Sequence, residues 1–245
     1  MLIKLEIDTE NIKRNFEKIK EINQNIICVL KDDAYGLGIE SILPVLINEG
    51  CLYFATAYIG EALKIKNIVK RDFPNKVEKI SVMVLNYIEE NELKKSVKNG
   101  IEITIFNFEQ LEKYIHVLKN EERIKVHIKF NTGMNRLGFD EKETEKLIEK
   151  IKVISNIDIM SIYSHISDVG NEKETEKQIA RYERIVSIFD KNEVKYGVKH
   201  IQASPLLFKY RGKYNYDFAR VGMAIYGMEP LSEKTGLYPV VKLLL

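Results

Sequence analysis

The sequence contains only two cysteines in 245 residues, which is too few for the disulfide framework of a secreted domain and favours a reducing compartment. No stretch approaches the roughly 18 consecutive apolar residues of a membrane span, and the N-terminus lacks a basic segment followed by an apolar one. Basic and acidic residues, 38 against 36, are interspersed without a basic block. The composition therefore predicts a soluble cytoplasmic protein whose partners include neither nucleic acid nor membrane.

Short β-rich runs alternate with charged amphipathic segments, as is typical of βα units that build a parallel sheet. We count eight such runs, at residues 26–30, 53–58, 80–85, 101–106, 124–130, 159–165, 198–203 and 218–226. Eight parallel strands predict an α/β fold of the (β/α)8 TIM-barrel type, and an open doubly wound sheet is the alternative. Helices are predicted to begin at Asn107, as an N-cap, and at Asp140, where acidic residues occupy the first turn.

The last nine residues, Leu237 to Leu245, resemble the beginning of another strand after a polar link at residues 231–236. An apolar terminal strand without a partner promotes aggregation, which indicates a missing partner domain. We expect residues 1–235 to form the barrel and residues 236–245 to begin a truncated C-terminal β-domain. The alternative is a short strand that folds back onto the barrel.

Lys31 lies where the apolar run at residues 26–30 meets a glycine-rich turn. Burial penalises a charged ammonium and lowers the pKa of a lysine amine toward the range in which the amine is nucleophilic. A Schiff base on Lys31 is one hypothesis for this position, and the residues described next favour it. The alternative is a lysine that marks the solvent edge of a strand.

Polar residues gather at the C-terminal ends of the predicted strands, where barrel enzymes carry their active sites. Ser204 and the backbone of Gly222 and Met223 offer a hydroxyl and amide donors for a phosphate, and Tyr35 offers a further donor. A Schiff-base lysine, a phosphate site and an arginine near a pyridine nitrogen indicate pyridoxal phosphate. The two glycines that flank Leu37 do not complete a dinucleotide fingerprint, which argues against NAD, and no metal is expected. The residues at these strand ends are Lys31, Lys129, Arg136, His165, Ser204, Arg220 and Gly222.

At these motifs the chain resembles alanine racemase, from about Leu5 to its end. The segments that carry the resemblance, in the family's order, are 29–38 (VLKDDAYGLG), 131–138 (NTGMNRLG), 163–165 (YSH), His200 with Ala203 and Ser204, and 220–227 (RVGMAIYG). The resemblance implies the N-terminal barrel of a pyridoxal phosphate-dependent racemase. Such an enzyme is a homodimer that converts L-alanine to D-alanine and so supplies D-alanine for peptidoglycan.

The resemblance also implies a role for each site residue. Lys31 would hold the cofactor and then act as one of two bases at the α-carbon. Arg136 would donate a hydrogen bond to the phenolic oxygen of the cofactor, and Lys129, often carbamylated in relatives, would hold Arg136 in place. His165 would lie against the cofactor ring and contact Arg220. The catalytic residues would be Lys31, Arg136 and His165, and the remaining cofactor-binding residues would be Tyr35, Ser204, Arg220, Gly222, Met223 and Tyr226.

Arg220 would face the pyridine nitrogen in this resemblance. A guanidinium does not give up its proton, so it donates a hydrogen bond to the ring nitrogen without protonating it. The ring is then a weaker electron sink, which favours return of the proton to the α-carbon over transamination.

The chain departs from the family pattern at three positions. Asn131 stands where an aspartate is usual, Leu37 where histidine is common, and Ala203 where asparagine often precedes Ser204. The family's second base, a tyrosine of the C-terminal domain, has no counterpart in this sequence, which predicts weak or no activity for the chain alone. The alternatives are a non-catalytic single-domain barrel of pyridoxal phosphate homeostasis and a decarboxylase, which Arg220 disfavours. The sequence leaves open alanine, serine or another small amino acid as substrate.

Overall fold

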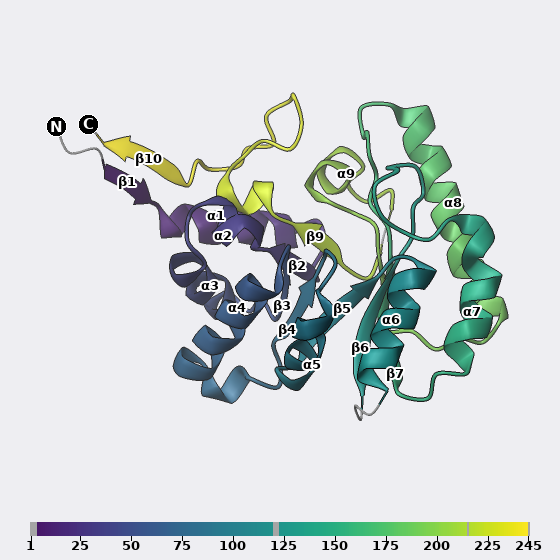
Figure 1. Ribbon diagram of the computed structural model, residues 1–245. Helices are drawn as coiled ribbons and strands as arrows, with labels where there is room; N and C mark the ends of the chain where they lie inside the picture. Colours follow the sequence, from purple (N-terminus) through teal and green to yellow (C-terminus); the bar gives the residue numbers. More distant parts are fainter. Residues whose placement is uncertain (1–3, 120–122, 215, 245) are drawn as a thin grey trace. The chain divides into compact units, whose positions relative to one another are not determined.

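The frame of the chain is an eight-stranded sheet whose strands match the eight predicted runs (Figure 1). The computed structural model describes residues 4–119, 123–214 and 216–244. Hydrogen bonding gives the strand order β8-β7-β6-β5-β4-β3-β2-β9. The strands are β2 (Ile26–Val29), β3 (Tyr53–Thr56), β4 (Ser81–Val84), β5 (Ile101–Ile105), β6 (Ile124–Lys129), β7 (Ile157–Tyr163), β8 (Val198–His200) and β9 (Ala219–Val221).

The eighth strand meets the first, which distinguishes a barrel from an open sheet. β9 pairs in parallel with β2, and Arg220 lies opposite Ile27. On the other side of β9, the Arg220 N–H donates to the Gln202 carbonyl over 2.9 Å, and Ala203 forms a parallel bridge with Arg220. Both of these partners follow β8 closely in the sequence. The predicted (β/α)8 barrel class is therefore confirmed, and the doubly wound alternative is not.

The chain divides into two compact units, which we describe separately. Unit 1 comprises residues 1–82 and 202–245, and unit 2 comprises residues 83–201. The predicted site residues are divided between them. Lys31, Tyr35 and the residues from Ser204 onward belong to unit 1, whereas Lys129, Arg136 and His165 belong to unit 2.

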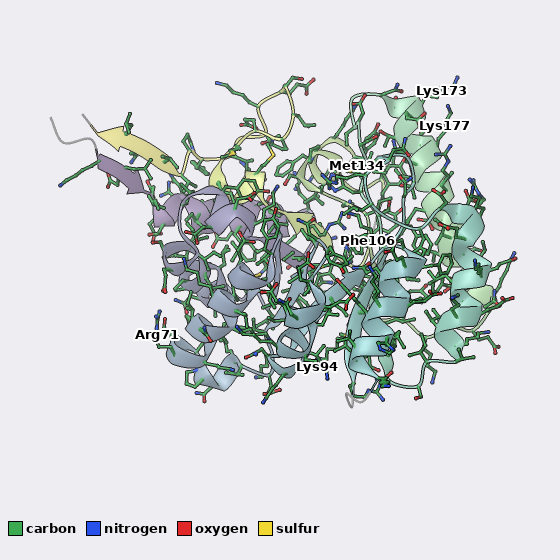
Figure 2. The ribbon with its side chains drawn as sticks, viewed as in Figure 1. Arg71, Lys94, Phe106, Met134, Lys173 and Lys177 are labelled. Carbon is green, nitrogen blue, oxygen red and sulfur yellow. The ribbon has the colours of Figure 1, made fainter. Side chains whose placement is uncertain are left out.

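The helices of unit 1 each bury one apolar side. In α1 the buried residues include Ile12, Phe16 and Ile19, and the carboxylate of Asp8 caps this helix by accepting the Asn11 N–H over 3.1 Å. Arg71, labelled in Figure 2, lies near the end of α4 and is exposed. The helical elements of unit 1 are α1 (Thr9–Lys20), α2 (Lys31–Tyr35), α3 (Ile39–Asn48), α4 (Ile59–Asp72), α9 (Ser204–Lys209) and the 3₁₀ turns η1 (Pro74–Lys76) and η3 (Met223–Tyr226).

The helices of unit 2 confirm both predicted helix starts. Asn107 accepts the Gln110 N–H over 2.7 Å, and Asp140 and Glu143 form a reciprocal capping box. The second start differs in one respect, because its first turn is a 3₁₀ turn. In Figure 2, Lys173 and Lys177 project outward from α8. The helical elements of unit 2 are α5 (Glu90–Lys98), α6 (Phe108–Leu118), η2 (Glu141–Glu143), α7 (Thr144–Lys152) and α8 (Glu172–Lys191).

Several strands end earlier than predicted, and for β3 the cause is a side chain that takes the next backbone N–H donors. The predicted strand at residues 53–58 stops at Thr56, since the Glu61 carboxylate accepts the N–H groups of Ala57 and Tyr58 over 3.0 and 3.2 Å. The run at residues 218–226 was predicted as one strand, and that prediction is wrong. Its strand ends at Val221, and after Gly222 the chain forms the 3₁₀ turn η3.

The tail forms the predicted strand but is not without a partner. β10 (Val241–Leu244) pairs antiparallel with β1 (Lys4–Ile7), a strand that the sequence reading missed, and the two lie side by side in Figure 1. The expectation of an unpaired terminal strand is therefore corrected for residues 241–244, while Met1–Ile3 and Leu245 lie outside the described residues. Leu5 and Leu243 remain largely exposed in this two-stranded ribbon.

Apolar side chains fill the core of each unit, and burial of each large one contributes roughly 1.5–3 kcal/mol. None of the described helices combines the length and the apolar composition that crossing a membrane requires. The core of unit 1 includes Ile12, Phe16, Ile42, Leu46, Phe54 and Val69, and that of unit 2 includes Leu93, Tyr114, Phe130, Phe139, Tyr182 and Phe189.

Asn15 of α1 is buried and joins the helix to two segments of the same unit. Its Nδ2 donates to the carbonyls of Ile225 and Tyr238 over 3.2 and 2.8 Å, and its Oδ1 accepts the Tyr238 N–H over 2.7 Å. We expect Asn15→Leu to lower the free energy of unfolding by about 2–4 kcal/mol, because these backbone groups lose their partner inside the protein. Urea denaturation measures the loss.

Asn11 supplies the matched control for this substitution. Its Nδ2 donates to the Pro239 carbonyl over 2.8 Å at an exposed position, where water replaces the lost bond. We expect Asn11→Leu to cost less than about 1 kcal/mol. Equal losses for the two variants would contradict the assignment.

Candidate functional site

Lys31 directly follows the buried end of β2. Leu30 is fully buried, whereas the Lys31 side chain is 41% exposed, with its Nζ 3.4 Å from the Asp32 carboxylate. The same Nζ lies 5.6 Å from the ring centroid of Tyr35. The structure therefore does not bury the Lys31 amine, although the sequence led us to expect burial. It leaves an accessible amine at the C-terminal end of a strand.

The backbone after Lys31 turns left-handed over four successive residues. Asp32, Asp33, Ala34 and Tyr35 have φ angles of 54°, 51°, 58° and 56°, and Gly36 follows at 83°. A left-handed conformation costs an L-residue roughly 1–2 kcal/mol, because Cβ approaches the following carbonyl oxygen. The turn therefore holds strain beside Lys31 that its surroundings must offset.

Two carboxylates hold this left-handed turn. Glu61 accepts the Asp33 N–H over 3.0 Å, and the same carboxylate binds the N–H groups that end β3. Asp33 accepts the Ile39 N–H over 3.0 Å and binds the Lys64 ammonium at 2.9 Å. The Ile39 N–H and then Lys64 lower the pKa of Asp33 below its usual value. The sequence reading missed Glu61. Its bonds to Ala57 and Tyr58 are local, but its bond to the Asp33 N–H spans 28 residues.

The left-handed turn places the Tyr35 ring beside η3 of the same unit. A Cβ on Gly222 would lie 2.4 Å from the Tyr35 hydroxyl oxygen, so only glycine fits there without displacing the ring. The Tyr35 and Tyr226 rings lie 5.1 Å apart, and the Tyr226 hydroxyl donates to the Val29 carbonyl over 3.2 Å. Burial raises the pKa of both phenols, so both keep their protons at neutral pH.

The remaining predicted site residues of unit 1 are Ser204, Arg220 and Met223. Ser204 is buried and begins α9, and Arg220 is buried in β9. Met223 is 39% exposed at the start of η3, the first turn of which leaves amide donors without partners in the helix. The structure thus brings Lys31, Tyr35, Gly222 and Tyr226 together within unit 1.

In unit 2, Lys129 is the last residue of β6 and is buried. Its Nζ lies 5.8 Å from the ring centroid of Tyr163, on the neighbouring strand β7. His165 follows β7 and is partly exposed. Ser164 stands between Tyr163 and His165 in the sequence. Its hydroxyl bonds the Thr132 hydroxyl at 2.8 Å and the Phe130 carbonyl at 2.8 Å, and these two bonds join the end of β7 to the loop after β6.

The loop that carries Arg136 is built around Asn131. Its Oδ1 accepts the N–H groups of Gly133 and Asn135 over 3.2 and 2.9 Å, and Asn135 has a φ of 54°. Gly138 returns the loop to β6, where a Cβ would lie 2.4 Å from the Asn131 nitrogen. Arg136 is exposed in this loop, and Met134, labelled in Figure 2, is partly exposed.

A hollow of about 560 Å³ adjoins this loop on unit 2. Carboxylates and one guanidinium line it, together with amides of the loop. Arg181 is fixed there by donating to the Thr132 carbonyl over 3.0 Å. The predicted site residues are not among its lining residues, which are Asn131, Gly133, Asn135, Asp140, Glu141, Lys142, Glu145, Arg181 and Ile188.

Comparisons with known proteins identify the chain's relatives. Residues 7–230 match the family model described as "Alanine racemase, N-terminal domain". Alanine racemase 1 of Clostridium acetobutylicum is 30% identical over 248 residues, covering 97% of this chain and 62% of the relative. The alanine racemase of Fusobacterium nucleatum is 32% identical over 229 residues, covering 91% of this chain and 60% of the relative.

Among solved structures, the alanine racemase of Clostridium difficile in complex with cycloserine matches with a TM-score of 0.89 and 25% identity. The match covers 99% of this chain and 67% of that chain. The chain therefore spans about three-fifths of the length of the curated relatives it matches.

The left-handed turn predicts an unusual effect of glycine. Asp32→Gly removes the Cβ at a φ of 54° and should raise the free energy of unfolding by about 1 kcal/mol, after deduction of glycine's entropic cost. The exposed pair with Lys31 that it removes is worth little. Glu17→Gly, at an exposed right-handed position of α1, should instead lower stability by about 1 kcal/mol. Thermal unfolding of both variants checks the difference in sign, and destabilisation of both would refute the strain.

The lowered pKa of Asp33 predicts a dependence of stability on pH. Its folded-state pKa lies below the unfolded value, so its stabilisation is present above about pH 4 and is lost as the pH falls through the folded pKa. Compared with Asp33→Asn, the wild-type chain should therefore be more stable at pH 7, and the advantage should shrink at pH 3. Lys64→Met should keep part of the effect, because the Ile39 N–H remains. Urea denaturation at the two pH values measures it, and a constant difference would contradict this account.

Proposed function

Because the chain belongs to the alanine racemase N-terminal domain family, we propose that it forms the pyridoxal phosphate-binding barrel domain of an amino-acid racemase. Residues 1–235 would be this domain, and residues 236–245 would begin the next one. The end of the family match at residue 230 and the greater length of the relatives support these bounds.

The arrangement of Lys31, Tyr35 and Gly222 is the observation that carries the proposal. Gly222 leaves space where a Cβ would strike the Tyr35 hydroxyl, so a phenol donor and a side-chain-free backbone face the same point. A phosphate is recognised by such hydroxyl and amide donors. Tyr35, Ser204 and the amides of Gly222 and Met223 would bind the phosphate, and Tyr226 would hold the Tyr35 ring against them.

Pyridoxal phosphate supplies an electrophilic carbon and a ring that delocalises charge from the substrate α-carbon. Lys31 Nζ, accessible at the end of β2, would bind that carbon and would then move the proton at the α-carbon. Arg220 would donate a hydrogen bond to the ring nitrogen and keep its own proton.

For unit 2, family membership supports the roles that the motifs imply. Arg136 would donate to the phenolic oxygen of the cofactor, and Lys129, as a carbamate, would accept from Arg136. A carbamate converts a cation into an anion, which removes the repulsion between the two side chains. His165 would lie against the cofactor ring.

The finer features of the function are proposals that rest on the relatives. We propose alanine as substrate, D-alanine for peptidoglycan as product, a homodimer as the working assembly, and the cytoplasm as its location. The names of the curated relatives support the substrate. The family match does not favour a non-catalytic homeostasis barrel.

The first test is covalent attachment of the cofactor. With pyridoxal phosphate, the chain should turn yellow, and borohydride reduction should leave a pyridoxyl group on the peptide that contains Lys31. Lys31→Arg keeps the positive charge but forms no imine, so it should lose both signals. Lys13→Arg, an exposed lysine of α1 paired with Glu10, is the control and should retain them. A pyridoxyl group on another lysine, or none, would overturn the assignment of Lys31.

A further inference from the structure

Four neighbouring strands of unit 2 carry polar side chains on one face. Residues two apart on a strand share a face, so β5, β6 and β7 alternate between apolar and polar sides. Barrel interiors are filled mainly by branched apolar residues, and a polar row there is unusual. The row consists of Glu102, Thr104, His127, Lys129, Ser161, Tyr163 and His200, all of them at most 6% exposed.

Hydrogen bonds join four members of this row in a continuous chain. Glu102 Oε2 lies 2.8 Å from His127 Nε2, and His127 Nδ1 lies 2.7 Å from the Ser161 hydroxyl. The same hydroxyl lies 2.9 Å from His200 Nε2. The chain thus crosses from β5 to β8 inside unit 2.

The series of hydrogen bonds from Glu102 to His200 also advances along the strands toward their C-terminal ends. His127 is in register with Thr104, two residues beyond Glu102, and Ser161 is in register with Val198, two residues before His200. Four residues of rise correspond to about 13 Å. His200 is the last residue of β8, at the strand ends where barrels carry their active sites.

The Ser161 hydroxyl gives this series of hydrogen bonds a direction, because a hydroxyl has a single proton to donate. In the part of the chain that the structure describes, the two imidazole nitrogens are the partners of the Ser161 hydroxyl. A hydroxyl has one proton, so it donates to one nitrogen and accepts from the other. When His127 is neutral, its Nε2–H donates to Glu102 and its Nδ1 accepts from Ser161. His200 must then carry its hydrogen on Nε2.

A proton added to His127 reverses both bonds at Ser161, while His127 Nε2–H still donates to Glu102. His127 Nδ1–H then donates to Ser161, and Ser161 donates to His200 Nε2. Neutral His200 must now carry its hydrogen on Nδ1. The two rings lie 6.3 Å apart, a distance at which like charges disfavour each other, so the second ring remains neutral while the first is charged.

We propose that Glu102, His127 and Ser161 form a proton relay that sets which ring nitrogen of His200 carries hydrogen. These three are positioning residues, which act through His200. His200 stacks on Tyr163 at 4.9 Å, and Lys129 faces the same Tyr163 ring at 5.8 Å, so Tyr163 and Lys129 are among the titratable groups around it. Thr104 bonds the Tyr163 hydroxyl at 3.2 Å and completes the row.

The use of this relay in catalysis rests on the proposed function, but the tautomer change belongs to the chain itself. A proton stored at His127 would change the hydrogen-bonding polarity at the C-terminal end of β8 from acceptor to donor at His200 Nδ1. An amino-acid racemase must hold and return a proton, and such a change supplies a buried group that does so without water.

The test uses the full chain without cofactor and follows its ring nitrogens by ¹⁵N NMR. The chain has four histidines, so single substitutions assign every ring, and exposed His116 on α6 is the internal reference. As the pH is lowered, the His200 hydrogen should move from Nε2 to Nδ1 with the same midpoint at which His127 gains its proton. A His200 ring that keeps one tautomer while His127 titrates would overturn the relay without any variant.

Three variants separate a relay from simple packing. Glu102→Gln removes the anion that pairs with His127, and any change in the midpoint of one ring should be matched by the other. Ser161→Ala should leave His127 titrating while His200 no longer follows, and Ser161→Thr, which keeps a hydroxyl, should restore the coupling. Ser96→Ala removes another buried hydroxyl of unit 2, on α5, and should change neither ring.

Two results among the variants would contradict the relay: coupling that survives in Ser161→Ala, or midpoints that move apart in Glu102→Gln. Because no cofactor is added, these results are independent of Lys31. Failure of cofactor attachment would overturn the proposed function and leave the relay standing. Failure of the tautomer change would do the reverse.

Discussion

The reversal of backbone handedness after Lys31 is the constraint on which the candidate site of unit 1 depends. Four L-residues at positive φ together cost several kcal/mol, and no single hydrogen bond of the turn offsets that. The Glu61 carboxylate helps because it satisfies the Asp33 N–H and two N–H groups at the end of β3 at once. One carboxylate therefore ends a strand, begins α4 and holds the turn that directs Tyr35 toward Gly222.

In the loop after β6, backbone N–H groups of a turn are bound by an amide in place of a carboxylate. Asn131 Oδ1 accepts two backbone N–H groups, as an aspartate would, while its Nδ2 donates to Asn135 Oδ1 over 3.0 Å and faces Asp140 at 3.5 Å. A carboxylate at this position could accept the same bonds but would repel Asp140. Asn131 thus holds the turn that carries Arg136 without placing a second negative charge beside Asp140.

Local chemistry made the strands and helix starts predictable. β-branched runs identified all eight strands of the sheet, and Asn107 and Asp140 cap the helices that their positions predicted. Strand ends were less predictable: the end of β3 is decided by a side chain of the next helix, Glu61, and not by the residues of the strand. The pairing of β1 with β10 was also missed, since it joins the two ends of the described chain. Motif resemblance predicted roles for Lys31 and Tyr35, but the left-handed turn that joins them depends on contacts with Glu61 and Lys64, which are distant in sequence.

Packing alone does not require the polar row of unit 2. Valine, isoleucine and leucine fill such an interior at lower cost, since a buried carboxylate beside imidazole rings must recover its lost hydration through hydrogen bonds. Here each bond depends on the next, because Ser161 has one proton to give and two nitrogens to face. Its sequence signal is faint: Glu102 interrupts an isoleucine-rich run, and His127 stands between valine and isoleucine. A polar residue at an inward position of a barrel strand is therefore a reason to look for a buried hydrogen-bonded network. The strand pairing then identifies which residues are its members.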